Sequence, residues 1–221
     1  LISDVTVVDQ EQIRDYSPAE PITDILANTP GITVRSNGGL GTTTNVQIRG
    51  GTNAQTILLV DGLRLNSATS GAPPWAYIPM PQIGRMEVVR GPTSSSYGSD
   101  AIGGVIQLFT RKGEGPTKFY ADAGYGTYNT TSETVGVEGS ENGLSYSIYG
   151  ANTHSVSFPT RVQGYSGYNP NPASYTNTSG SGNFAYTVAP GQELGMKALW
   201  GNGQNAYTDT STKMATILES M

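Results

Sequence analysis

The sequence predicts an α+β domain over residues 1–113, a small mixed sheet with short helices, followed over residues 114–221 by antiparallel strands. Three observations support this prediction. Helix and strand patterns are mixed in the first part, whereas period-two alternation dominates the second. Eight of the twelve basic residues and nine of the thirteen prolines precede position 117, and ten of the thirteen tyrosines follow it. The boundary is therefore expected in the Gly-Glu-Gly-Pro segment at 113–116.

Composition excludes several classes of protein. Only 13% of the 221 residues are charged, and a disordered chain would usually carry more charge. The net charge of −5, without a basic cluster, argues against a nucleic-acid partner. Cysteine is absent and there is one histidine, which excludes thiolate chemistry and disfavours a zinc site. There is no apolar run of about 18 residues to predict a transmembrane helix, but a transmembrane strand needs only about 9–11 alternating residues.

The first part begins with a strand and two helices. Residues 4–8 form an apolar strand. Asp9 begins a helix that extends to residue 16, because Gln12 occupies the capping-box position three residues later. Pro21 begins a second helix that ends near residue 28, before a Thr-Pro-Gly stop. The apolar stripe of this second helix consists of Ile22, Ile25 and Leu26.

Six further strands complete the first part. The strongest signal is TILLV-DG-LRL at 56–65, which predicts a hairpin because two β-prone runs flank a two-residue Asp-Gly turn. The Gly103-Gly104 doublet is expected to let the last strand enter the sheet without a side-chain clash. Residues 92–97 before it should form a compact turn. The other strands are expected at 32–35, 46–49, 84–90 and 105–110.

The second part alternates between apolar and polar residues. The pattern covers residues 118–125, 144–151, 184–188 and 194–200, with Leu199 as an exception, and residues 134–138 fit it less cleanly. A half-buried sheet of a soluble protein would give the same alternation. The positions of the aromatic residues favour a transmembrane β-barrel, because they lie near strand ends, where interfacial girdles form. These residues are Tyr120, Tyr125, Tyr128, Tyr146, Tyr186 and Trp200.

The connections between these strands point in the same direction. Residues 141–143 and 189–191 are tight turns, whereas residues 155–181 form a long polar segment rich in tyrosine and asparagine. Short turns at one end of a barrel and long loops at the other are typical of outer-membrane proteins.

Two motifs that suggest enzymes are weak. The glycine-rich segment 37–41 leads into a strand, whereas a dinucleotide-binding loop would lead into a helix. Ser94–Ser96 do not fit a nucleophile elbow, and His154 lies on a barrel-like strand, where it is expected to face the lumen or an interface. No catalytic residue is therefore assigned, and the protein is expected not to be an enzyme.

Arg49 and Arg90 each follow an apolar strand and precede a glycine. Each guanidinium should therefore emerge where a sheet meets a turn. A solvated arginine is the simple interpretation, but the repeated pattern suggests a paired role in binding carboxylates. Glu87 and Asp100 lie nearby in the sequence, although the sequence does not fix the partners.

At this point four motifs resemble the plug domain of TonB-dependent outer-membrane transporters. They are DILANTPGI (24–32), IRG (48–50), LLVDGLRLN (58–66) and IGRMEVVRGPTSSSYGSDAIGGVIQL (83–108), in the family's order and spacing. The resemblance extends over about residues 3–110. Within the family the motifs are most similar to those of cobalamin (vitamin B12) transporters, but haem and siderophore receptors share most of them.

The resemblance implies a plug, residues 1–113, inside a barrel of about 22 strands in the outer membrane of a Gram-negative bacterium. It implies energy-coupled uptake of a scarce metal chelate, cobalamin or a ferric siderophore or haem. TonB with ExbB and ExbD would be the partners, and a Ton box would precede Leu1. The transported ligand would carry cobalt or iron, and no cofactor of the protein itself is implied.

The resemblance also implies site residues. Arg49 and Arg90 are similar to the plug arginines that pair with barrel glutamates and hold the plug in place. The apical loops would be residues 36–44 and 66–77, and external-loop tyrosines would add contacts. The candidate ligand-binding residues are Asn37, Gly38, Gly39, Leu40, Thr42, Asn66, Ser67, Ser70, Trp75, Tyr77, Tyr165 and Tyr168, with Tyr175 as a further external-loop candidate.

Two features depart from the family pattern. About five barrel strands follow the plug, and these cannot close a barrel wall without leaving unpaired edges in lipid. We therefore expect the chain to be a portion of a longer protein or to be completed by a second chain. A structural or assembly subunit, or a surface receptor, is the alternative function. Residues 159–181 contain no Asp or Glu, so a calcium-assisted external loop is not expected.

Overall fold

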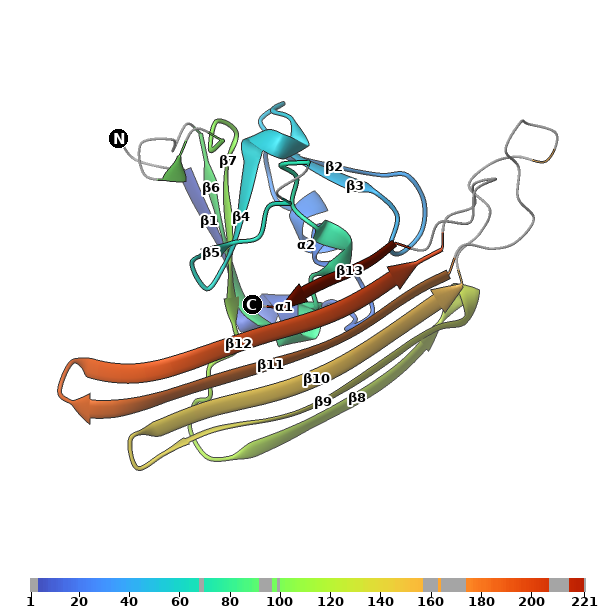
Figure 1. Cartoon of the computed structure of the whole chain (residues 1–221). Coiled ribbons are helices and arrows are strands. Elements are labelled where there is room, and N and C mark those ends of the chain that lie inside the picture. Colours follow the sequence, from blue (N-terminus) through green and yellow to red (C-terminus); the bar gives the residue numbers. More distant parts are fainter. Residues whose placement is uncertain are drawn as a thin grey trace.

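The protein is described by a computed structural model that covers residues 4–67, 70–91, 97–98, 100–156, 163 and 174–206, together with the backbone of residues 215–220. Figure 1 shows two parts: a mixed α/β unit and a curved sheet of long strands that passes along one side of it. The expected turn at 92–97 lies largely outside the described residues.

The mixed unit is built on a five-stranded sheet in the order β1-β6-β7-β4-β5. Neighbouring strands are antiparallel except β4 and β7, which are parallel, so the sheet is mixed as predicted. Asp61 and Gly62 in the β4–β5 turn both have positive φ, at 48° and 88°, as expected for an Asp-Gly hairpin. The strands are β1 (Asp4–Val8), β4 (Thr56–Val60), β5 (Leu63–Arg64), β6 (Ile83–Arg90) and β7 (Gly104–Thr110).

Two short helices and a separate hairpin lie beside this sheet. Asp9 and Gln12 form the predicted capping box at the start of α1 (Gln10–Arg14). Pro21 precedes α2 (Ile22–Ala27), whose apolar stripe is buried as predicted. Strands β2 (Ile32–Ser36) and β3 (Thr44–Ile48) pair only with each other. Within the described residues, the unit also contains three 3-10 turns: η1 (Asn53–Gln55), η2 (Trp75–Tyr77) and η3 (Met80–Gln82).

Strand β4 lies inside the unit, and all five of its residues are buried. Leu58 and Val60 pack into the main core with the helices, whereas Ile57 and Leu59 pack into a second cluster with Ala101. A strand covered on both faces needs a continuous apolar run, which explains the TILLV sequence.

The second sheet has six strands, which pair antiparallel in chain order from β8 to β13. It contains one strand more than expected, because residues 215–220 form β13. The expectation of a loop through residue 181 was wrong, since β11 already begins at residue 174. β9 is also longer than predicted. The strands are β8 (Lys118–Gly126), β9 (Thr130–Glu141), β10 (Leu144–Val156), β11 (Ser174–Ala189), β12 (Gln192–Asn205) and β13 (Ala215–Ser220), with a 3-10 turn, η4 (Thr127–Asn129), after β8.

The two faces of this sheet differ as the alternation predicted. The face turned away from the mixed unit exposes large apolar side chains, including Phe119 (86% exposed) and Leu194 (73%). The inner face carries buried polar side chains such as Ser147 and Asn183. Leu199, the exception in the pattern, packs against the core of the mixed unit, which explains why an apolar residue occupies that position.

The six aromatic residues near the strand ends differ in their exposure. Tyr125, Tyr128, Tyr186 and Trp200 are exposed, and Tyr146 is half-buried. Tyr120 instead faces inward, where its ring lies 6.1 Å from that of Tyr149. Among the residues that the structure describes, no helix has the length and apolar character needed to cross a membrane.

Candidate functional site

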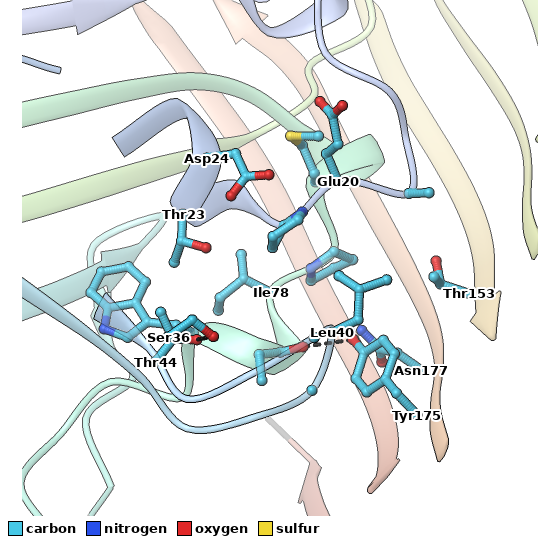
Figure 2. A pocket seen from close by; sticks show the side chains of 18 of the residues that line it. Glu20, Thr23, Asp24, Ser36, Leu40, Thr44, Ile78, Thr153, Tyr175 and Asn177 are labelled. Atoms are coloured by element: carbon cyan, nitrogen blue, oxygen red, sulfur yellow. Dashed lines mark hydrogen bonds between the residues drawn. The ribbon is translucent and has the colours of Figure 1, made fainter. Parts of the chain in front are cut away.

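A cavity of about 270 Å³ lies between the mixed unit and the inner face of the long sheet. The β2–β3 loop, the start of α2 and the segment 75–81 line one side of it, and residues of β10 and β11 line the other. Figure 2 shows Glu20 and Asp24 at one end, Tyr175 and Asn177 at the other, and Ile78 between them. The site is therefore built jointly by the two parts of the chain.

The first expected apical loop, residues 36–44, is ordered by its own hydroxyl groups. Ser36 Oγ donates to the carbonyl of Gly38 at 3.0 Å, and Thr42 Oγ1 donates to that of Gly39 at 2.8 Å. The two hydroxyls also lie 3.0 Å apart. Such side-chain bonds fix a polar loop without a hydrophobic core. Gly38, Gly39 and Leu40 consequently line the cavity, whereas Asn37 and Thr42 do not.

The second expected loop, residues 66–77, is held by Asn66. Its Oδ1 accepts from the backbone N–H of Leu58 at 3.1 Å, and its Nδ2 donates to the carbonyls of Thr56 and Gly71. The side chain therefore ties the loop to β4. The hydroxyl of Ser67 accepts from the N–H of Ser70, which is exposed.

Trp75 and Tyr77, at the end of this loop, make different contacts. The side chain of Trp75 is only 2% exposed, and its Nε1 donates to Asn53 Oδ1 at 3.1 Å. Trp75 still contributes to the cavity wall. The ring of Tyr77 lies 6.5 Å from that of Tyr175. Tyr165 and Tyr168 lie outside the described residues, so their contacts with the cavity are not described.

Tyr175 was expected in an external loop, and this expectation was wrong. It lies on β11, is only 5% exposed and lines the cavity. Its hydroxyl donates to the carbonyl of Ala76 at 2.6 Å, which joins the long sheet to the second loop.

Two carboxylates that sequence reasoning missed also line the cavity. Glu20 lies just before α2, and Asp24 lies in its first turn. Burial, followed by the negative charge of Glu20, raises the pKa of Asp24 above its usual value. The described residues contain no group of three or more acidic or histidine side chains that could hold a metal ion. The available sequence signal was a pair of acidic residues four positions apart, one before and one within the apolar stripe of the second helix.

Arg49 and Arg90 converge on a single carboxylate. Arg90 Nη1 lies 3.0 Å from Asp4 Oδ1, and Arg49 Nη2 lies 2.7 Å from Asp4 Oδ2. Arg90 Nη2 also donates to Thr6 Oγ1 at 2.7 Å. The side chain of Arg90 is 4% exposed, whereas that of Asp4 is 53% exposed. The nearby acidic residues serve other arginines, since Glu87 pairs with Arg85 and Asp100 pairs with Arg64.

Arg111, just after β7, joins the two parts of the chain and was not anticipated. Its backbone carbonyl accepts from Ser147 Oγ at 2.6 Å and from Asn183 Nδ2 at 3.2 Å. Its guanidinium carbon lies 5.0 Å from the ring centre of Tyr149 and 5.7 Å from that of Tyr120. Its Nε donates to the carbonyl of Pro81 at 2.6 Å. The buried cation is thus held by both the mixed unit and the long sheet.

The mixed unit matches a known family. The model of the TonB-dependent Receptor Plug Domain matches residues 1–105. Those residues are a TonB-dependent receptor plug domain. The mixed sheet with short helices, followed by antiparallel strands that do not close on themselves, agrees with this family's architecture as the sequence motifs predicted.

Known relatives extend the comparison. Two vitamin B12 transporters named BtuB, from Vibrio vulnificus strains YJ016 and CMCP6, are 39% identical over 132 residues and 41% identical over 114 residues. These alignments cover 60% and 52% of this chain, but only 21% and 18% of the relatives. The chain therefore spans about a fifth of the length of the curated relatives that it matches.

Solved structures share the fold over nearly the whole chain. The ferric enterobactin receptor PfeA of Pseudomonas aeruginosa superposes with a TM-score of 0.73 at 23% identity, over 94% of this chain and 34% of the receptor. The siderophore receptor PirA of Acinetobacter baumannii superposes with a TM-score of 0.71 at 26% identity, over 92% and 32%. These relatives are named as transporters and receptors, not as enzymes, in agreement with the expectation from the sequence.

Proposed function

We propose that the chain forms the plug and the first wall strands of a TonB-dependent transporter that takes up a metal chelate across the outer membrane. We place the plug at residues 1–113 and the start of the wall at 114–221, since β7 ends at Thr110 and β8 begins at Lys118. The cavity lined by both parts carries the proposal, because a chelate bound there would contact plug and wall together.

The outer face of the long sheet supports a location in the outer membrane. Its exposed apolar residues, such as Phe119, Leu194 and Met196, would contact the lipid of the outer membrane of a Gram-negative bacterium. TonB, energised through ExbB and ExbD, would be the periplasmic partner. The relatives favour transport over the alternative of an assembly subunit or surface receptor whose barrel is completed by a second chain.

Cobalamin is the first ligand to test, because the relatives with about 40% identity are vitamin B12 transporters. A ferric siderophore is the second, since the similar folds include siderophore receptors. The candidate contacts are Gly38, Gly39 and Leu40, which line the cavity, and Asn37, Thr42, Ser67 and Ser70, which belong to the same two loops but do not line it. We also retain Arg49 and Arg90 as the residues that hold the plug in place.

The experiment uses the complete reading frame that contains these residues, produced in cells that lack their own cobalamin and siderophore receptors. Labelled cobalamin and ferric enterobactin are offered with and without an uncoupler of the proton gradient. We expect binding of one chelate under both conditions and uptake only with the gradient intact. Absence of binding to both chelates would overturn the proposal. Uptake that continues in the presence of the uncoupler would contradict the proposed role of TonB.

Gly39→Trp gives a variant matched to this assay. An indole at this cavity-lining position would occupy space that the chelate needs, so binding should weaken strongly. Gly126→Trp is the control, because Gly126, at the end of β8, does not line the cavity and, like Gly39, has no positive φ. Equal losses in the two variants would point to general destabilisation and count against the site.

A further inference from the structure

Two tyrosines and two glycines form a reciprocal contact between the plug loops and the wall. The ring of Tyr175, on β11, lies against Gly41 of the first loop, where an added Cβ would overlap the ring. The ring of Tyr77, in the second loop, lies against Gly203 of β12 in the same manner. We call these four residues, Gly41, Tyr77, Tyr175 and Gly203, the tyrosine–glycine cluster.

Hydrogen bonds reinforce each half of the cluster. The hydroxyl of Tyr175 donates to the carbonyl of Ala76, so this one wall residue contacts both loops. Asn205 Nδ2 donates to the carbonyl of Gly41, and Asn177 Nδ2 makes a long bond of 3.5 Å to the carbonyl of Tyr77. Every one of these bonds runs from a wall side chain to a loop carbonyl.

The register of the wall explains why the contacts meet. Tyr175 pairs with Asn205 across β11 and β12, and Asn177 pairs with Gly203. Residues two apart on a strand share a face, so all four point toward the plug. Two adjacent cross-strand pairs thus hold one residue from each loop, and the two tyrosine rings lie 6.5 Å apart.

We propose that the tyrosine–glycine cluster fixes the spacing between the two apical loops, so that Tyr77 and Tyr175 are positioning residues that determine which chelates bind. The inference rests on the proposed function, because Gly41 adjoins the candidate contacts Leu40 and Thr42, and Tyr77 ends the second loop. Because β11 and β12 contact both loops, these two strands determine how the loops are arranged around a bound ligand. Preorganisation of this kind raises affinity by lowering the ordering cost of binding.

The first test is Gly203→Ala, with Gly201→Ala as its matched control. Both glycines lie on the same face of β12, and neither has a positive φ. An added Cβ would overlap the Tyr77 ring at position 203, but would meet nothing within 4 Å at position 201. Only Gly203→Ala should therefore displace the second loop.

Loop spacing is measured on the complete protein by electron spin resonance, with spin labels at Asn37→Cys and Ser70→Cys. Both positions are exposed, and this chain contains no native cysteine. We expect Gly203→Ala to shift or broaden the distance distribution and Gly201→Ala to leave it unchanged. In unlabelled protein, Gly203→Ala should weaken binding of cobalamin or ferric enterobactin about tenfold.

Two further variants separate the parts of the cluster. Tyr175→Phe removes the hydroxyl that donates to Ala76 and keeps the ring on Gly41, so it should change loop spacing less than Tyr175→Ala. In a Tyr77→Ala background, Gly203→Ala should have no further effect, because the ring that it displaces is gone. If the Gly203→Ala variant fails to assemble, Tyr175→Phe provides a second test of the loop spacing.

Equal distance distributions in Gly203→Ala, Gly201→Ala and Tyr175→Ala would overturn the proposal. A shifted spacing with unchanged affinity would overturn the role in binding and leave a purely structural contact. If the parent protein bound neither chelate, the proposed function would fail, whereas the spin-label distances would still decide whether the cluster sets the loop spacing.

Discussion

Asp4 and Arg90 are cross-strand partners in the β1–β6 ladder, and their side chains also form an ion pair of 3.0 Å. Because Arg49 binds the other oxygen of the same carboxylate, Asp4 forms ion pairs with two arginines at the edge of the sheet. The pairing of Arg49 and Arg90 anticipated from the sequence thus includes a common partner within the plug itself. Their expected pairing with barrel glutamates stays a prediction.

Asp4→Asn should destabilise the attachment of β1 by about 1–3 kcal/mol, because it leaves the buried Arg90 guanidinium without its counter-charge. Arg90→Gln should have a similar effect. Hydrogen exchange of the β1 amides in the complete protein measures the change. Glu87→Gln is the control: the Arg85–Glu87 pair is more exposed, so its loss should change stability by about 1 kcal/mol or less. Equal exchange rates in Asp4→Asn and Glu87→Gln would contradict the prediction.

Gly104→Ala should disrupt the edge where β7 enters the sheet. Its φ of 154° and the carbonyl of Val89 leave no room for a Cβ, so a loss of about 3 kcal/mol is expected. Gly50→Ala is the control, since Gly50 also has a positive φ but meets nothing within 4 Å, and its cost should be about 1 kcal/mol. Protease resistance of the plug in outer-membrane preparations distinguishes them, and similar resistance in both variants would argue against the clash.

Arg111→Gln should weaken the junction of plug and wall by about 2–4 kcal/mol, since it removes a buried charge stacked on two tyrosine rings. Arg111→Lys keeps the charge but loses the planar stacking and the Nε bond to Pro81, so an intermediate loss is expected. Urea titration followed by hydrogen exchange at β7 provides the measurement. If Arg111→Lys weakened the junction as much as Arg111→Gln, the charge of Arg111 would contribute little to the stability of the junction.

Asp24→Asn should stabilise the plug near neutral pH. Burial, and then the charge of Glu20, raises the pKa of Asp24 above 3.8, so the folded protein binds its proton more readily than the unfolded chain. The wild type therefore loses stability as pH rises from 3.8 through the raised pKa. The gain from Asp24→Asn should be greatest at neutral pH and should disappear below pH 3.8. Denaturant midpoints at both pH values test this, and a gain independent of pH would refute it.

Most of the fold follows from local sequence rules. The Asp-Gly turn, the capping box at Asp9 and the apolar run of β4 each specify their element within a few residues. The alternation in β10 and β12 likewise specifies two faces. The first eight residues of β11, SYTNTSGS, escaped prediction because this stretch has few apolar residues on either face. Its inner side binds plug carbonyls, so a strand there resembles a polar loop in sequence.

The site was less accessible from the sequence, because its contacts join distant residues. Asp4 lies 86 positions from Arg90, and Tyr175 lies 99 positions from Ala76. The loops 36–44 and 66–77 were recognisable from their turn chemistry and family motifs. The surface that faces these loops is formed by β10 and β11, and it exists only in the folded protein, where the long sheet passes along the plug. The sequence motifs therefore predicted where the loops lie, but not which residues hold them in place.

The wall contacts the plug mainly through hydroxyl and amide groups. Ser145, Ser147, Asn183 and Asn205 all donate to plug carbonyls or to the segment that follows β7, and Gln82 of the plug donates to Ser179. Each such bond contributes about 0.5–1.5 kcal/mol net, because water can replace either partner when the surfaces separate. An apolar interface would resist separation far more, since its apolar area would have to be hydrated. Separating the two parts would therefore break polar contacts that water can replace one by one, rather than expose a large apolar area.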